Sequence, residues 1–295
     1  MSFPLYLLLP LFSAIAYTFA AMLFKKVLES GGNIWYINFL SNIGTFILAI
    51  PFFLLGSQTP GHVDYLKPLF TSVIFVAGQM FSLLSLKYGD VTVATPLLGA
   101  KVIMVAFFTV MLLGIPVPVL WWVASVLAVV ALALLRGNTE KSKKSFLPTV
   151  VFSLLCSLCF ALCDIYIQKW APGFGANRFI SIMFFMVAVI SIGFVPMFRR
   201  RTIKFTTPFS RWLAISIVCI SAQSVAMGVA LSRFGNATAM NIVFSSRGMW
   251  SVLFIWWFGK FLGNEERLLG RKVFWERLAG AVLILAAIVL VMVQK

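Results

Sequence analysis

Residues 87–93 read Lys-Tyr-Gly-Asp-Val-Thr-Val, and residues 233–239 read Arg-Phe-Gly-Asn-Ala-Thr-Ala. Laid over each other, the two stretches match basic with basic, aromatic with aromatic, Gly with Gly and Thr with Thr. Continued without a gap, the same register places Lys101 on Arg247. A shorter match places Phe12-Ser13 near Phe152-Ser153. The sequence therefore predicts an internal repeat with one basic residue at the equivalent place in each copy.

The composition around this repeat is that of a membrane protein. Hydrophobic residues make up 61% of the chain and charged residues 11%, with a mean hydropathy of +1.01. Soluble domains average about 25% charged residues. The net charge of +16 comes from Lys and Arg that cluster in polar joints such as 136–144 and 199–204. We interpret these clusters as orientation signals and contacts for anionic lipid, and we expect no nucleic-acid partner.

Hydropathy divides the chain into ten predicted spans, each of about the 20 residues that a bilayer core requires. They are Leu5–Phe24, Asn33–Leu55, Pro68–Lys87, Thr92–Leu113, Val117–Leu135, Leu147–Trp170, Asn177–Phe198, Phe209–Ser232, Ala237–Leu262 and Phe274–Val293. The longest polar joint, 136–145, separates five spans from five. An odd number of spans in each repeat gives the repeats opposite orientations. The predicted fold is an all-α integral membrane protein of ten transmembrane helices, in two inverted five-helix repeats at 1–138 and 146–295.

Two basic residues lie at bilayer depth in this scheme. Lys101 falls inside the apolar stretch 93–113, and Arg247 falls inside 237–259. A charge at this depth costs roughly 2.5–3.5 kcal/mol on insertion scales, so it usually faces a cavity or a partner. Pro96 and Gly99 precede Lys101, and Gly248 follows Arg247, so we expect both spans to bend at the basic residue.

Other polar residues inside the predicted spans add hydrogen-bonding groups. Gln79 and Gln223 lie one span before Lys101 and Arg247, and Asn241 and Tyr17 lie inside spans as well. We predict that these four residues bind substrate together with Lys101 and Arg247, although Asn and Gln also serve as ordinary links between helices. Asp164 is the one acid well inside a predicted span, and it either carries a coupling proton or neutralises one of the two cations.

Cysteine usage adds little to this interpretation. Cys156, Cys159 and Cys163 share one helix face, and Cys219 lies in another apolar segment. We interpret the three as small residues at a helix seam rather than a soft-metal site, and we expect no metal. The sequence also has no phosphate-binding loop of the Gly-x4-Gly-Lys-Ser/Thr type, so we expect neither direct drive by ATP nor a cofactor.

Residues 86–97 (Leu-Lys-Tyr-Gly-Asp-Val-Thr-Val-Ala-Thr-Pro-Leu) and 261–266 (Phe-Leu-Gly-Asn-Glu-Glu), with five spans in each half, resemble the drug/metabolite transporter superfamily and its EamA-like members. The first half departs from the family pattern at 114–116, where Gly-Ile-Pro replaces a Gly-Glu element. In the same superfamily, plastid sugar-phosphate translocators hold phosphate with a Lys on the fourth span and a Lys-Arg pair on the ninth. The resemblance matches Lys101 and Arg247 to two of these residues, whereas Ser246 replaces the third.

We therefore predict a secondary transporter, or permease, that moves a small polar and anionic metabolite by alternating access. One alternative keeps the fold but exports hydrophobic amino acids or drugs, with Trp35, Phe107, Trp250 and Phe254 along the pathway and Arg247 paired with Asp164. A second alternative, a membrane-embedded enzyme, has less support because the chain has one His and eight acids.

The expected surroundings are a lipid bilayer and a small-molecule substrate, in a bacterial inner (plasma) membrane. The sequence favours no oligomeric state. Most Lys and Arg residues fall in joints after odd-numbered spans, and positive-inside bias then places both termini outside the cytoplasm. The resemblance implies the opposite orientation, with both termini inside.

Overall fold

The computed structural model describes residues 5–55, 64–88, 97–136, 146–199, 207–262 and 271–293, and within these ranges the chain is helical with no strand. The first half forms η1 (Leu5–Leu7), α1 (Leu8–Glu29), α2 (Ile34–Leu54), α3 (Leu66–Tyr88), α5 (Lys101–Leu113) and α6 (Val119–Arg136). The second half forms α7 (Phe146–Phe174), α8 (Ala176–Ser191), η2 (Ile192–Phe194), α9 (Val195–Arg199), α10 (Thr207–Phe234), α11 (Ala237–Phe244), α12 (Arg247–Leu262) and α13 (Arg271–Val293). The motif residues at 89–96 and 263–266 lie outside the described residues.

Within the described residues, six helical segments are long and apolar enough to cross a membrane. They are Leu5–Leu28, Ile34–Leu54, Leu66–Ser85, Val150–Phe174, Ala176–Phe198 and Ser210–Phe234. Three shorter apolar helices accompany them, at Leu97–Leu113, Val119–Leu134 and Leu278–Val293. These segments make the protein a multi-pass integral membrane protein, as predicted. The count of ten crossings stays a prediction.

Both basic residues begin a helix after an interruption. In the second half, α11 ends at Phe244, the backbone N–H of Ser246 donates to the Val243 carbonyl over 3.0 Å, and α12 begins at Arg247. In the first half, a turn in which the Ala100 N–H donates to the Leu97 carbonyl over 3.1 Å precedes Lys101. These tight three-residue bonds replace the regular helical ones. The breaks fall where the Gly and Pro pattern predicts them.

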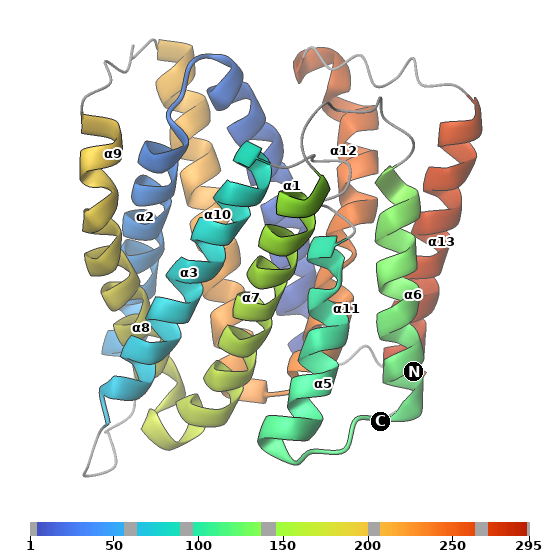
Figure 1. The fold of residues 1–295 in the computed structure, drawn as a ribbon, viewed down its shortest axis with the longest axis horizontal. Helices are drawn as coiled ribbons and strands as arrows, with labels where there is room; N and C mark the ends of the chain where they lie inside the picture. Colours follow the sequence, from blue (N-terminus) through green and yellow to red (C-terminus); the bar gives the residue numbers. More distant parts are fainter. Residues whose placement is uncertain are drawn as a thin grey trace.

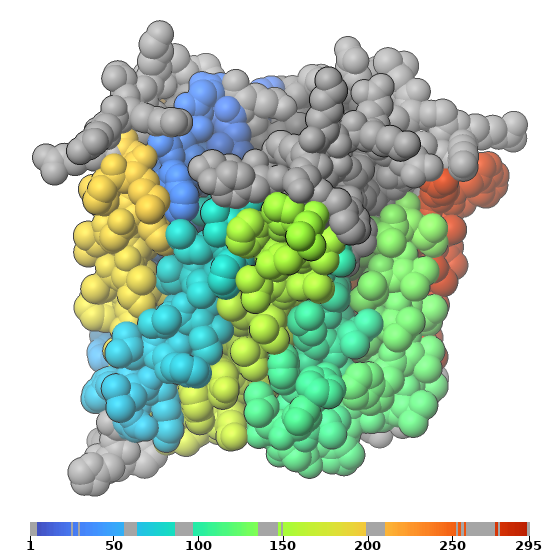
Figure 2. Space-filling model, in the orientation of Figure 1, coloured from blue at the N-terminus to red at the C-terminus, as the bar shows by residue number. Residues whose placement is uncertain are grey.

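Packing divides the bundle into a centre and two edges (Figure 1). In the centre, α1 packs on α10, α3 packs on α7, and α5 contacts both α7 and α11. At one edge α6 pairs with α13, and at the other α2 pairs with α8. The space-filling view shows side chains of α3, α7, α5 and α6 forming a continuous face (Figure 2).

Small residues allow several of these helices to approach closely. A Cβ added to Gly44 on α2 would lie 2.7 Å from Ile217 Cγ2 and 2.8 Å from Ser221 Oγ, both on α10. Ser181 Oγ on α8 donates to the Ala49 carbonyl of α2 over 2.7 Å. Close backbone approach with short polar side chains is typical of packing between membrane helices.

Hydrogen bonds also join helix ends at the lower end of the bundle in Figure 1. Thr109 Oγ1 of α5 and Thr238 Oγ1 of α11 lie 3.1 Å apart. The Ala237 N–H donates to Gln168 Oε1 of α7 over 2.9 Å, and Lys169 Nζ donates to the Leu112 carbonyl over 3.0 Å. These three contacts hold α5, α7 and α11 together below the two helix breaks.

Candidate functional site

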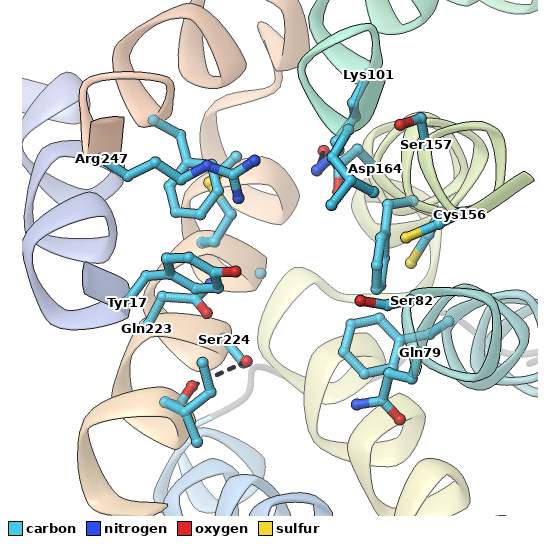
Figure 3. A pocket seen from close by; sticks show the side chains of 18 of the residues that line it. Tyr17, Gln79, Ser82, Lys101, Cys156, Ser157, Asp164, Gln223, Ser224 and Arg247 are labelled. Atoms are coloured by element: carbon cyan, nitrogen blue, oxygen red, sulfur yellow. Dashed lines mark hydrogen bonds and ion pairs between the residues drawn. The ribbon is translucent and has the colours of Figure 1, made fainter. Parts of the chain in front are cut away.

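A cavity of about 330 Å³ lies between the central helices, at the level of the two breaks. Side chains from α1, α3, α5, α7, α10 and α12 supply most of its polar lining. Its volume is at the lower end of the range of about 300–1,000 Å³ that is usual for small-molecule sites. Figure 3 shows Lys101 and Asp164 on one side of the cavity and Arg247 and Tyr17 on the other.

Lys101 lines the cavity, but it is neutralised there. Its Nζ lies 2.7 Å from Asp164 Oδ2 of α7, and the two side chains are 17% and 10% exposed. The ammonium also lies 5.8 Å from the ring centroid of Phe160. Because little water reaches the pair, separating the two charges would leave each poorly solvated. Asp164 therefore acts as the counter-charge of Lys101 in this structure.

Asn241 does not line the cavity. It is buried on α11, where its Nδ2 donates to Asp164 Oδ2 over 2.8 Å and to the Ala237 carbonyl over 2.9 Å. The predicted substrate-binding side chain thus lies behind the Lys101–Asp164 pair. Its amide orients the carboxylate that faces Lys101.

Arg247 has a different environment. No carboxylate forms an ion pair with it among the described residues. Its guanidinium carbon instead lies 5.0 Å from the ring centroid of Tyr17 and 4.9 Å from that of Phe244, within cation–π range. Figure 3 shows the guanidinium directed into the cavity. Tyr17, predicted to bind substrate through its hydroxyl, also lines the cavity and supplies its ring to Arg247.

The two glutamines both line the cavity, but only one has a partner within the described ranges. Gln79 Nε2 donates to Asn42 Oδ1 over 2.9 Å, and Asn42 Nδ2 donates to Gln79 Oε1 over 3.1 Å. Gln223 has no side-chain hydrogen bond to another described residue, and its backbone carbonyl accepts from Ser13 Oγ. Among the described residues its amide is thus unengaged, whereas the Gln79 amide is bound to Asn42 of α2.

Sequence reasoning did not select several lining residues. Asn38 lies on the lining with its Nδ2 buried and unbonded to any described group, and hydropathy identifies it only as polar within a span. Ser82, Cys156, Ser157, Phe160 and Ser224 were also missed because small and aromatic residues are common throughout such spans. The part of the chain that the structure describes contains no group of three or more His, Cys, Asp or Glu suited to a metal ion.

The fold and the cavity define a polytopic helical membrane protein with a small, partly charged central site. Residues 4–137 match the EamA-like transporter family, which is part of the drug/metabolite transporter superfamily. The match is to a family of membrane transporters, a class of protein whose substrates are small molecules. No curated protein matches the chain. Among 29 matching chains of solved structures, one titled only "Crystal structure of protein" superposes with a TM-score of 0.78 and 11% identity over 100% of both chains. That likeness concerns the fold alone.

Proposed function

We propose that this transporter carries a small anionic metabolite through the central cavity by alternating access, without ATP. The observation that supports this most directly is Arg247, a cation without a described carboxylate partner that points into the cavity. Keeping such a charge at membrane depth is costly unless a ligand or water compensates it. A carboxylate or phosphate would supply that compensation through paired hydrogen bonds to the guanidinium.

The proposed architecture is two inverted five-helix repeats, at 1–138 and 146–295. Helix contacts support it because they recur in matched pairs when α1 is equated with α7, α2 with α8, α3 with α10, and α5 with α12. Thus α1 packs on α10 as α7 packs on α3, and α2 packs on α10 as α8 packs on α3. Ser13 of α1 contacts α10, and Ser153 of α7 makes the repeat-related contact with α3. The paired helices place Lys101 and Arg247 on opposite cavity walls.

Alternating access would use these two walls as the moving parts. One wall comes from α3, α5 and α7, and the other from α1, α10 and α12. The repeat relation exchanges them, as expected for transporters with a midplane site between inverted repeats. The helices α3, α6, α9 and α12 all end at the upper end of the bundle in Figure 1, and Lys or Arg residues are frequent in the sequence that follows α6, α9 and α12. Positive-inside bias then favours the upper end as cytoplasmic. Placement in a bacterial inner membrane stays a prediction.

The alternative of hydrophobic amino acid or drug export has weaker support. It relies on Arg247 pairing with Asp164, whereas Asp164 lies 2.7 Å from Lys101. The aromatic residues assigned to that pathway, Trp35, Phe107, Trp250 and Phe254, are absent from the described lining.

An enzyme has less support still, because the one acid among the described lining residues is already bound to Lys101 and Asn241.

Uptake into proteoliposomes by the purified protein tests the proposal. Labelled carboxylates, sugar phosphates and neutral amino acids should be compared in wild type, Arg247→Gln and the matched surface variant Arg211→Gln, whose side chain is exposed on α10. We expect uptake of anions by wild type and Arg211→Gln, with a loss of about 100-fold in Arg247→Gln. Uptake of neutral solutes alone, or anion uptake that survives in Arg247→Gln, would contradict an anion carrier.

A further inference from the structure

We infer that the cavity selects a monoanion, specifically a molecule with one carboxylate and a compact apolar body, and discriminates against doubly charged phosphates. This inference rests on the proposed transport function and adds the substrate class. It follows from the charges on the described lining, the surroundings of Arg247 and the rest of the cavity wall.

Charge balance is the first support. The ionised side chains among the described lining residues are Lys101, Asp164 and Arg247. The opposite charges of Lys101 and Asp164, 2.7 Å apart, neutralise each other, so the positive charge of Arg247 remains in excess. A monoanion at Arg247 makes the loaded cavity neutral. A dianion leaves it with a net negative charge in surroundings where charge interactions are several-fold stronger than in water.

Lys101 is poorly placed to neutralise a second negative charge. To bind an anion fully, its ammonium would have to leave Asp164, whose carboxylate would then face the same anion. Asn241 further holds that carboxylate in place by donating to it over 2.8 Å. Breaking a buried ion pair while retaining one partner is strongly unfavourable, because the remaining charge is left uncompensated. The pair therefore behaves as a fixed neutral unit.

The surroundings of Arg247 accommodate one acidic group beside an apolar body. The rings of Tyr17 and Phe244 meet at 71° with centroids 5.8 Å apart, and both lie about 5 Å from the guanidinium. Rings cover part of the guanidinium, and the in-plane N–H groups remain for a bidentate carboxylate. Beyond this point the lining is largely apolar, with Phe75, Phe184 and Met227 among its members. An apolar body of modest size fits this surface.

Equilibrium binding to the purified full-length protein in detergent tests the charge count, using labelled phenylacetate, phenyl phosphate and phenylacetamide at pH 8. A branched-alkyl trio with the same three head groups should be run in parallel. At this pH the phosphate esters are dianions, because their second pKa is about 6. We expect wild type to bind at least one of the monocarboxylates about 10-fold more tightly than the matched phosphate or amide. Arg247→Gln should weaken that binding about 100-fold, and Lys67→Gln, outside the cavity, should leave it unchanged.

Two further variants test how the number of uncompensated positive charges in the cavity affects selectivity. Asp164→Asn leaves two cations in excess, and the ratio of phosphate to carboxylate affinity should rise about 10-fold or more. The double variant Lys101→Met/Asp164→Leu has one uncompensated positive charge, as the wild type does. It should therefore still bind the carboxylate more tightly than the phosphate. If Asp164→Asn does not yield folded protein, the double variant and Arg247→Gln carry the test.

Tighter binding of a phosphate than of its carboxylate by wild type, failure of every monocarboxylate to bind, or loss of the preference in the double variant would overturn the inference. Uptake of phosphate esters would overturn it while leaving the proposed anion transport intact. Conversely, monocarboxylate binding with the expected dependence on charge but without uptake would overturn the transport proposal and keep the site chemistry.

Discussion

Lys101 and Arg247 begin equivalent half-helices on opposite walls of one cavity, yet their positive charges have different neighbours. Lys101 is held 2.7 Å from Asp164, and Asn241 supports that acid from behind. Arg247 has two aromatic rings and an open cavity instead. The repeat equates the two positions, but the neighbours of each position differ. One charge is thus retained within an ion pair, and the other is the group that we propose binds the substrate.

The largest expected effect comes from breaking the pair on the Lys101 wall. Asp164→Leu leaves an unpaired ammonium at a site that is 17% exposed, and we expect a loss of about 3 kcal/mol in stability. Adding Lys101→Met should recover most of that loss because both charges are then gone. Thermal unfolding of detergent-purified protein, followed by the tryptophan fluorescence, measures both variants. Equal instability of the single and double variants would mean that the pair contributes through shape rather than charge.

A smaller effect should come from changing the cation on the other wall without removing its charge. Arg247→Lys keeps one positive charge in excess but loses the planar fork and the contact with Tyr17 and Phe244. We expect anion uptake to fall by about 10-fold with little change in stability. The matched change Arg211→Lys on the surface should leave uptake unaltered. Unchanged uptake in Arg247→Lys would show that charge alone matters at this position.

The smallest effect should distinguish the two glutamines. Gln223→Leu removes an amide that no described residue engages, and Gln79→Leu breaks a two-bond contact with Asn42. Hydrogen bonds between membrane helices average about 0.6 kcal/mol, so Gln79→Leu should cost about 1 kcal/mol of stability. Gln223→Leu should instead raise the Michaelis constant for uptake about 3-fold and leave stability unchanged. Measuring both quantities in both variants makes the comparison, and a reversed assignment would contradict it.

Much of this site follows from sequence because hydropathy and the repeat register place Lys101, Arg247, Gln79 and Gln223 at one depth on central helices. The ion-pair partner of Asp164 could not be predicted from sequence, because choosing between Lys101 and Arg247 requires knowing how α7 packs on α5. Asn241 also misleads. It lies six residues before Arg247, which rotates its side chain well away from that of Arg247 even before the break at Ser245 and Ser246. The aromatic lining was likewise beyond sequence reasoning, since 30 Phe residues leave no way to select Phe244.

The contacts at the lower end of the bundle set an energy scale for the proposed cycle. Two hydrogen bonds there join α11 to α5 and α7, and a third lies between α5 and α7, which form one wall. At about 0.6 kcal/mol each, the two bonds to α11 total about 1.2 kcal/mol, which corresponds to a population ratio of about 8 to 1 between closed and open forms in the proposed cycle. A ligand that favours the open form by the same amount would equalise the two populations. In the proposed cycle, contacts of this strength would let the lower end open spontaneously, and the exchange of one solute for another would need no larger source of energy.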